Sequence, residues 1–197
     1  SAWNENPEET LIGNRSIGTE TDFEIVSQLG TQASGISYRA VCPSDGSEID
    51  VLVLSGLEPD AAERVKKRVR LASRLKHPAA TRIITSHLDG TDESVLLEMV
   101  SQSTLFELLS QSDEVSAGKL LSVGCQLASV LSAGHRLGLA HGHLTPSTVH
   151  IRSDGSAQID FVRPFPNTET SLADVIETQF LAPEATGDEP DAAADVF

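Results

Sequence analysis

The sequence predicts an α+β fold in two parts, a five-stranded antiparallel sheet with one inserted helix and then a mainly helical part with a small hairpin. Short apolar runs bounded by turn residues fill 23–55 and 80–100. Between them, 58–77 places apolar residues at three- and four-residue steps, which is the period of a helix. We therefore divide the chain into an extended or mobile arm (1–21), a sheet part (22–101) and a helical part (102–197).

The five strands are predicted from runs of apolar residues separated by glycine and turn sequences such as "PSDGS" and "DGTD". Antiparallel pairing follows from the short, hairpin-like connections. The expected strands are 23–30, 36–42, 48–55, 80–90 and 94–100.

The inserted helix is predicted over 58–77, where Pro59 and Asp60 suit a first turn and His77-Pro78 ends the pattern. In the second part, 103–110 and 116–138 read as helices. A hairpin is expected between 148–152 and 156–162, with its turn at "SDG". Residues 163–194 are rich in proline and are expected to be loops.

Composition limits the possible functions. The 197 residues carry a formal net charge of −15, which argues against nucleic-acid binding by the molecule as a whole. No apolar run is long enough to span a bilayer, so we expect no membrane insertion. Cys42 and Cys125 are expected to be reduced thiols of a cytoplasmic protein, or of the cytoplasmic part of a larger one.

Positive charge is concentrated in one place. Seven of the 14 cationic residues lie between 64 and 76: Arg64, Lys66, Lys67, Arg68, Arg70, Arg74 and Lys76. This segment is either a solvated helix face or a docking face for an acidic partner, with the chain's own acidic tail as one candidate.

Seven stretches, in order, resemble the eukaryotic-type Ser/Thr protein kinase family. They are "LGTQASGISYRAV" (glycine-rich loop), "DVLVLS" (third strand), "RLKHP" (end of helix C), "LLEMVSQSTLFELL" (hinge), "LGLAHGHLTPSTVHI" (catalytic loop), "IDFV" (D-F-G) and "FLAPE" (A-P-E). The resemblance runs from about Phe23 to the last residue. It implies a two-lobe fold with a partial C-lobe, and in the family such a fold binds ATP and magnesium and phosphorylates proteins.

Several positions depart from the family pattern at the phosphate end. Gly30 and Gly35 keep the outer glycines, but Gln32 replaces the middle one. Leu54 stands where the family has its phosphate-binding lysine, and Arg68 stands where helix C has the partner glutamate. A leucine cannot anchor phosphate, although Arg68 could conceivably reach it.

The catalytic loop departs further. His141 and the frame residues are kept, but His143 replaces the catalytic aspartate, Thr145 the lysine and Thr148 the metal-binding asparagine. Two alignments of "IDFV" remain open. Asp160 serves as the D-F-G aspartate in one, whereas a gap-free alignment puts Phe161 there and leaves no metal ligand. Asp160 is thus the single candidate metal ligand, and we expect no metal site.

The adenine pocket is also altered. Leu52 adds bulk where the family has alanine, and the remaining wall and hinge positions are Ser37, Leu97, Glu98, Val100 and His150. Overpacking a tight slot costs about 1–3 kcal/mol, so we expect no cofactor and no ATP binding. ATP and magnesium would bind only if the domain were an active kinase.

Three functional readings follow. The first is a pseudokinase, a binding, scaffolding or regulatory module within a larger bacterial signalling protein. The second is a weakly active Ser/Thr kinase that uses His143, Asp160 and Arg68. The third is a metal-dependent hydrolase that uses His141, His143 and His150, for which no further ligand cluster is visible.

The chain stops where the family's central C-lobe helix begins, so we expect incomplete support for the catalytic loop from Asp195 and for the A-P-E glutamate, Glu184. The same open side predicts self-association or a partner contact there. Thr and Ser residues between 167 and 178 are candidate phosphoacceptors or simply solvated.

Overall fold

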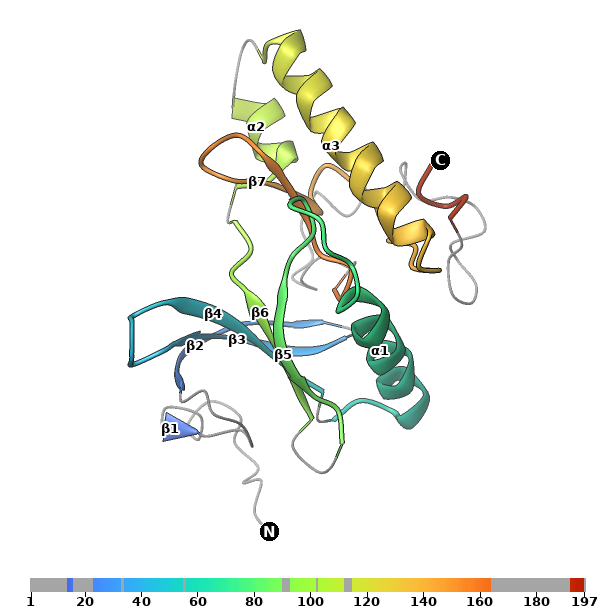
Figure 1. Cartoon of the computed structure of the whole chain (residues 1–197). Helices are drawn as coiled ribbons and strands as arrows, with labels where there is room; N and C mark the ends of the chain where they lie inside the picture. Colours follow the sequence, from blue (N-terminus) through green and yellow to red (C-terminus); the bar gives the residue numbers. More distant parts are fainter. Residues whose placement is uncertain are drawn as a thin grey trace.

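The computed structural model of the chain (Figure 1) describes residues 14–15, 23–32, 34–54, 56–89, 93–101, 103–111, 115–163 and 192–196. Most of the predicted arm and the whole of 167–178 lie outside these residues, as does Glu184. The expectations for those segments therefore stay predictions.

The predicted antiparallel sheet is confirmed, with a two-residue strand added at its edge. The strand order is β1-β2-β3-β4-β6-β5 and every neighbouring pair is antiparallel. The five expected strands are β2 (Phe23–Gln32), β3 (Gly35–Val41), β4 (Glu48–Val53), β5 (Ile83–His87) and β6 (Ser94–Glu98). The additional strand β1 (Asn14–Arg15) pairs with the start of β2.

Side chains of β4 alternate between the two faces of the sheet, as a strand requires. Ile49 and Val51 belong to an apolar cluster on one face, together with Phe23 and Tyr38. Leu52 enters the larger cluster on the other face, which also holds residues of the helical part. This second face is therefore the one that looks toward the rest of the molecule.

Helix α1 (Pro59–Ala72) covers that second face, where it buries Val65, Val69 and Ala72 (Figure 1). The helix ends five residues before the predicted 77. The Ser73 hydroxyl donates to the carbonyl of Arg70 at 2.9 Å and satisfies one of the free carbonyls at the helix end. The apolar period continues to Leu75, which is buried in a turn rather than in helix.

The second part holds α2 (Leu105–Gln111), α3 (Ala117–His135) and the hairpin of β7 (Val149–Ile151) and β8 (Ala157–Ile159). The Ser116 side chain caps α3 by accepting from the amide of Lys119. The two parts are joined by backbone hydrogen bonds. The amide of Ile159 donates to Ala79 at 2.9 Å, and the amide of Thr81 donates to Ile159 at 2.8 Å. This junction fixes the end of β8 beneath the sheet, where the candidate site lies.

Candidate functional site

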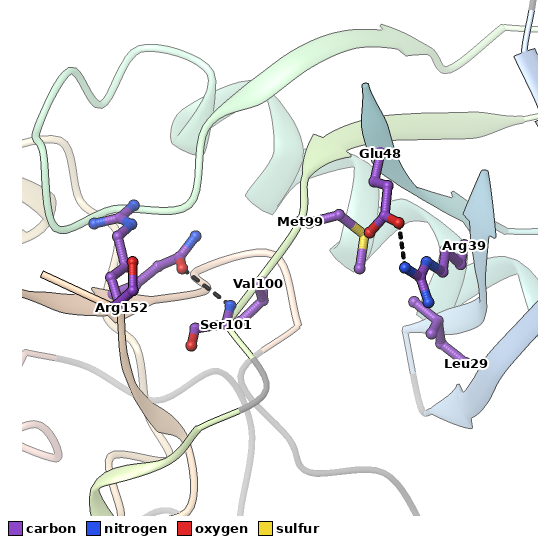
Figure 2. A pocket seen from close by; sticks show the side chains of 9 residues that line it. Leu29, Arg39, Glu48, Met99, Val100, Ser101 and Arg152 are labelled. Carbon is purple, nitrogen blue, oxygen red and sulfur yellow. Dashed lines mark hydrogen bonds and ion pairs between the residues drawn. The ribbon is translucent and has the colours of Figure 1, made fainter. Parts of the chain in front are cut away.

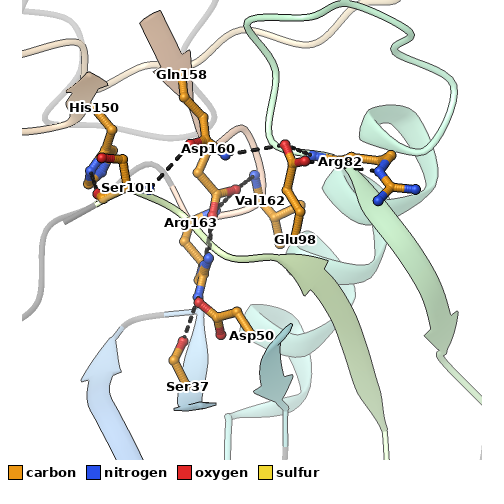
Figure 3. Close-up of polar contacts among 10 residues, drawn as sticks. All are labelled: Ser37, Asp50, Arg82, Glu98, Ser101, His150, Gln158, Asp160, Val162 and Arg163. Atoms are coloured by element: carbon orange, nitrogen blue, oxygen red, sulfur yellow. Dashed lines mark hydrogen bonds and ion pairs between the residues drawn. The ribbon is translucent and has the colours of Figure 1, made fainter. Parts of the chain in front are cut away.

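An arginine side chain bridges the space between the two parts of the fold (Figure 3). Arg163 follows β8, and its Nε donates to Oδ2 of Asp160 at 2.8 Å. From there the guanidinium extends to the sheet, where one Nη atom donates to Asp50 on β4 at 2.6 Å and to Ser37 on β3 at 2.8 Å. One cation is thus held between two carboxylates and a hydroxyl from three different elements.

This network is buried. The side chains of Arg163, Asp50 and Asp160 are 6%, 5% and 8% exposed. Desolvation would by itself lower the pKa of Arg163, but the charges of Asp160 and Asp50 raise it above its ordinary value, so the group stays protonated.

The pKa values of the two carboxylates shift in opposite directions. Burial by itself would raise the pKa of Asp160, but the charge and hydrogen bonds of Arg163 and the amide of Val162 bring that pKa below its ordinary value. Burial raises the pKa of Asp50 and outweighs the lowering by Arg163. One oxygen of Asp50 has no hydrogen-bond partner. The arginine therefore neutralises a site that would otherwise hold two buried acids.

Arg68 on α1 points into the same region and donates to three backbone carbonyls. Its Nε lies 2.9 Å from the oxygen of Phe161, and its Nη2 lies 2.8 Å from that of Ala140 and 3.3 Å from that of His141. The expectation that Arg68 could reach a phosphate is not supported, because these carbonyls hold the guanidinium. It ties α1 to two loops of the second part.

Hydroxyls organise the loop 141–148. The Thr148 hydroxyl accepts from the amide of Thr145 at 2.9 Å and lies 2.9 Å from the carbonyl of His143. Both threonines are buried, and so is His143. Thr145 and Thr148 therefore stabilise a turn.

His141 is buried beneath the network and packs edge-on against Phe161, with ring centroids 5.7 Å apart. Burial lowers the pKa of His141 to about 4, although the carboxylate of Asp195 opposes the shift. Asp195 accepts from the amide of His141 at 2.8 Å and from that of Gly142 at 2.6 Å, and a ring nitrogen of His135 lies 2.7 Å away. The expectation that this support would be incomplete is wrong for Asp195, which holds the loop backbone through both carboxylate oxygens.

A pocket of about 490 Å³ lies beside the segment that connects the two parts (Figure 2). Polar groups on its wall are largely paired with one another: Arg39 with Glu48, and Ser101 with Gln158. Its lining residues are Leu29, Arg39, Glu48, Met99, Val100, Ser101, Arg152, Ser153 and Gln158.

Comparison with known proteins relates the chain to serine/threonine protein kinases of bacteria. No family model matches it. It is 28% identical over 95% of its length to serine/threonine-protein kinase pkn2 of Myxococcus xanthus, and 30% identical over 90% to PknK of Mycobacterium tuberculosis. A probable serine/threonine-protein kinase of Streptomyces coelicolor is 27% identical over 89%. The chain is a relative of the serine/threonine protein kinases. It spans 24%, 17% and 28% of the length of these three kinases.

The resemblance to kinases relates the residues of the network to positions of the kinase cleft. In the first of the two alignments Asp160 takes the D-F-G aspartate position; in the structure this residue pairs with Arg163, and Phe161 packs against His141. The resemblance placed Ser37 in the wall of the adenine pocket, and the structure brings Ser37 and Asp160 together through Arg163. Two members of the network were missed, Asp50 and Arg163. A charge at Asp50, within the run "IDVLVL" and on the same strand face as Leu52, was the available signal, because a buried charge requires a partner.

The other predicted cleft positions are occupied by apolar side chains or by side chains that already form hydrogen bonds. Leu52 is fully buried, and one of its methyl carbons lies 3.1 Å from where a Cβ on Gly35 would stand. Leu54 and Leu97 are buried too. A ring nitrogen of His150 lies 2.7 Å from the carbonyl of Ser101.

The hinge residue Glu98 faces away from this cleft, toward the backbone amide of Arg82 and the side chains of Arg152 and Gln158. Val100 lines the pocket of Figure 2. Gly30 and Gln32 belong to β2, opposite Ser37 and Gly35, and the side chain of Gln32 lies outside the described residues.

A magnesium-bound nucleotide in the kinase manner requires a cation for its phosphates and free carboxylate oxygens for its metal. Leu54 offers no charge, and both oxygens of Asp160 are engaged by Arg163 and by backbone amides. The residues present therefore do not fit that cofactor. The hydrolase reading gains no support either, since no group of three or more His, Cys, Asp or Glu in the described ranges is arranged to hold a metal.

The helical part exposes apolar side chains. Leu121 of α3 is 69% exposed, and Leu120 and Leu109 are about 40% and 44% exposed. The expected self-association or partner contact on this side stays a prediction. None of the helices described above has the length and apolar content that a bilayer crossing requires.

Proposed function

We propose that this chain is a catalytically inactive protein-kinase-like domain, a pseudokinase, that works as a nucleotide-independent binding module in signalling. The observation that carries the proposal is the buried network of Arg163, Asp160, Asp50 and Ser37 between the lobes. A nucleotide would have to displace an arginine that is already neutralised and would leave two buried carboxylates facing its phosphates.

Catalysis faces a separate obstacle. Phosphoryl transfer depends on positioning and on electrostatic stabilisation of charge, so the loss of several charged groups together costs many powers of ten in rate. Thr145 and Thr148 take the lysine and asparagine positions in the resemblance. The Thr148 hydroxyl bonds the amide of Thr145 and the carbonyl of His143, and the Thr145 hydroxyl lies 3.5 Å from that of Thr148, so both groups serve the loop's own turn. His143 alone cannot replace these groups. We therefore infer that the lobes are held together for binding rather than for turnover.

The test is a titration of the purified protein with ATP, with and without magnesium, followed by thermal shift and calorimetry. We expect no magnesium-dependent stabilisation at millimolar ATP. A ligand that binds only the folded state stabilises it by RT ln(1 + [L]/Kd), so a protein that does not bind ATP gains no stability from it. An active serine/threonine kinase domain serves as the positive control. A clear magnesium-dependent shift, or incorporation of labelled phosphate into the protein itself, would overturn the proposal.

A further inference from the structure

The outer face of α1 and the turn that follows it carry a row of cations, which we call the basic stripe: Arg64, Lys67 and Arg70 on the helix, and Arg74 in the turn. Steps of three residues place the three helical members on one side of α1, opposite the buried Val65 and Val69, and Arg74 follows in the turn. All four are exposed. At a rise of about 1.5 Å per residue, the stripe is about 15 Å long.

Three members of the stripe form no ion pair among the described residues, unlike a lysine beside them. Lys66, on the flank of the helix, pairs with Glu63 and with Glu93. In contrast, Arg64, Arg70 and Arg74 form no ion pair with any residue that the structure describes. In a chain with 29 acidic and 14 cationic residues, such a patch is a local reversal of charge.

The helix that carries the stripe is rigidly held. Val65 and Val69 are buried against the sheet, and Arg68 is fixed by the three carbonyls of the catalytic-loop and D-F-G segments. The exposed cations are therefore displayed on a fixed backbone, and less conformational entropy is lost when a partner binds.

The charge distribution selects the kind of partner. Between 64 and 76 there are seven cationic residues and no acidic one, whereas the rest of the chain holds all 29 acidic residues and seven cations. A nucleic-acid duplex or an anionic membrane extends far beyond 15 Å and would meet that acidic remainder. A short peptide with carboxylates spaced along one face would meet the stripe alone.

We infer that the basic stripe docks an acidic peptide segment of a second protein. This inference rests on the proposed role as a binding module and names its partner by chemistry. The chain's own C-terminal acid Asp195 is engaged at the loop backbone of His141 and Gly142. Arg64, Arg70 and Arg74 form no ion pair with an acid of the described residues. The occupant that we propose is an acidic segment of a second protein, and the chain's own acidic tail is the alternative that the experiment separates.

The experiment measures anisotropy of a fluorescein-labelled peptide of about twelve residues, half of them glutamate, at low and at physiological salt. We expect binding that weakens with salt and falls at least tenfold in the Arg64→Glu/Arg70→Glu/Arg74→Glu variant. The matched pair is Arg70→Glu and Arg136→Glu, which make the same charge change on α1 and just after α3. Only Arg70→Glu is expected to weaken binding several-fold.

Several results would overturn the inference: no binding at low salt, equal losses in Arg70→Glu and Arg136→Glu, or equally tight binding of duplex DNA with the same loss. A fourth variant neutralises Glu184, Asp188, Glu189 and Asp191. If it bound the peptide several-fold more tightly, the chain's own tail would be the occupant instead. ATP titration of the same preparations separates the docking site from the proposed pseudokinase function. If the protein binds neither the peptide nor ATP, only the docking site is rejected.

Discussion

Replacing Arg163 with alanine removes the one cation that neutralises Asp50 and Asp160. Both carboxylates are less than a tenth exposed, so water cannot take over this role without opening the interface between the lobes. Breaking a buried ion pair by removing one partner costs about 3–5 kcal/mol. Because a domain of this kind is stable by about 5–15 kcal/mol, we expect a large and easily measured loss.

The loss should depend on pH in a defined direction. Arg163 lowers the pKa of Asp160, so that contribution to stability is fully present above the ordinary carboxyl pKa and is lost as pH falls through the lowered value. The raised pKa of Asp50 has the opposite sign, since stability falls as pH rises through the raised value. In the variant both acids gain protons more easily, and its deficit relative to wild type should shrink as the pH is lowered from 7 toward 4.

The assay is equilibrium urea unfolding at pH 7 and at lower pH, read by circular dichroism. Arg136→Ala, which removes an exposed arginine bonded only to Ser132 in the described structure, is the control and should stay within about 0.5 kcal/mol of wild type. If Arg163→Ala does not fold, Asp50→Asn tests the same network with a smaller loss. A deficit below about 1 kcal/mol for Arg163→Ala at pH 7 would refute the reasoning, because a buried and doubly paired cation cannot be removed so cheaply.

Other substitutions test separate parts of the structure. Gly35 has φ of 130° and a Cβ there would lie 2.3 Å from a strand carbonyl, so Gly35→Ala should cost at least about 1–3 kcal/mol in urea unfolding. Arg68→Met should cost about 2–3 kcal/mol and speed amide exchange in the loop, whereas Arg70→Met on the outer face should do neither. Because the pKa of His141 falls from 6.5 to about 4, its contribution should rise by about 3 kcal/mol between pH 4 and 6.5, and His141→Phe should flatten that part of the profile. Leu121→Ser should reduce any self-association seen by light scattering at high concentration, and a clean wild-type monomer would count against the open-side contact.

The five main strands of the antiparallel sheet could be predicted because apolar runs and turn residues are local signals. The apolar run of β4 and the three- and four-residue steps of α1 are both visible in the sequence. The end of α1 could not be predicted from periodicity, because Leu75 continues the apolar period while the chain is already in a turn. A buried residue in a turn and a buried residue in a helix can both appear in the sequence as an apolar residue at the helical spacing.

The candidate site was predictable in outline only. Family spacing placed Ser37 and Asp160 near the cleft, but it could not show that a third residue joins them. Arg163 is 126 residues from Ser37 and 113 from Asp50 along the chain, so no local pattern connects them. A sequence shows which catalytic or binding residues of a family have been replaced. A new contact between residues far apart in the chain can be found only from the three-dimensional structure.

The identity of the cation in the cleft has a functional consequence. In an active kinase the D-F-G aspartate binds a metal ion that enters and leaves the site together with the nucleotide. Here Asp160 is paired with Arg163, three residues further along the chain, and the same guanidinium also binds Asp50 on the sheet. A covalently attached cation is present at every nucleotide concentration, so under the proposed function closure of the lobes would not depend on ATP. Arg68 extends this connection, since it binds the carbonyl of Phe161 from the helix that displays the basic stripe. A partner bound to that helix would therefore meet one fixed arrangement of the lobes, which suits a docking module better than an enzyme that must open to release its product.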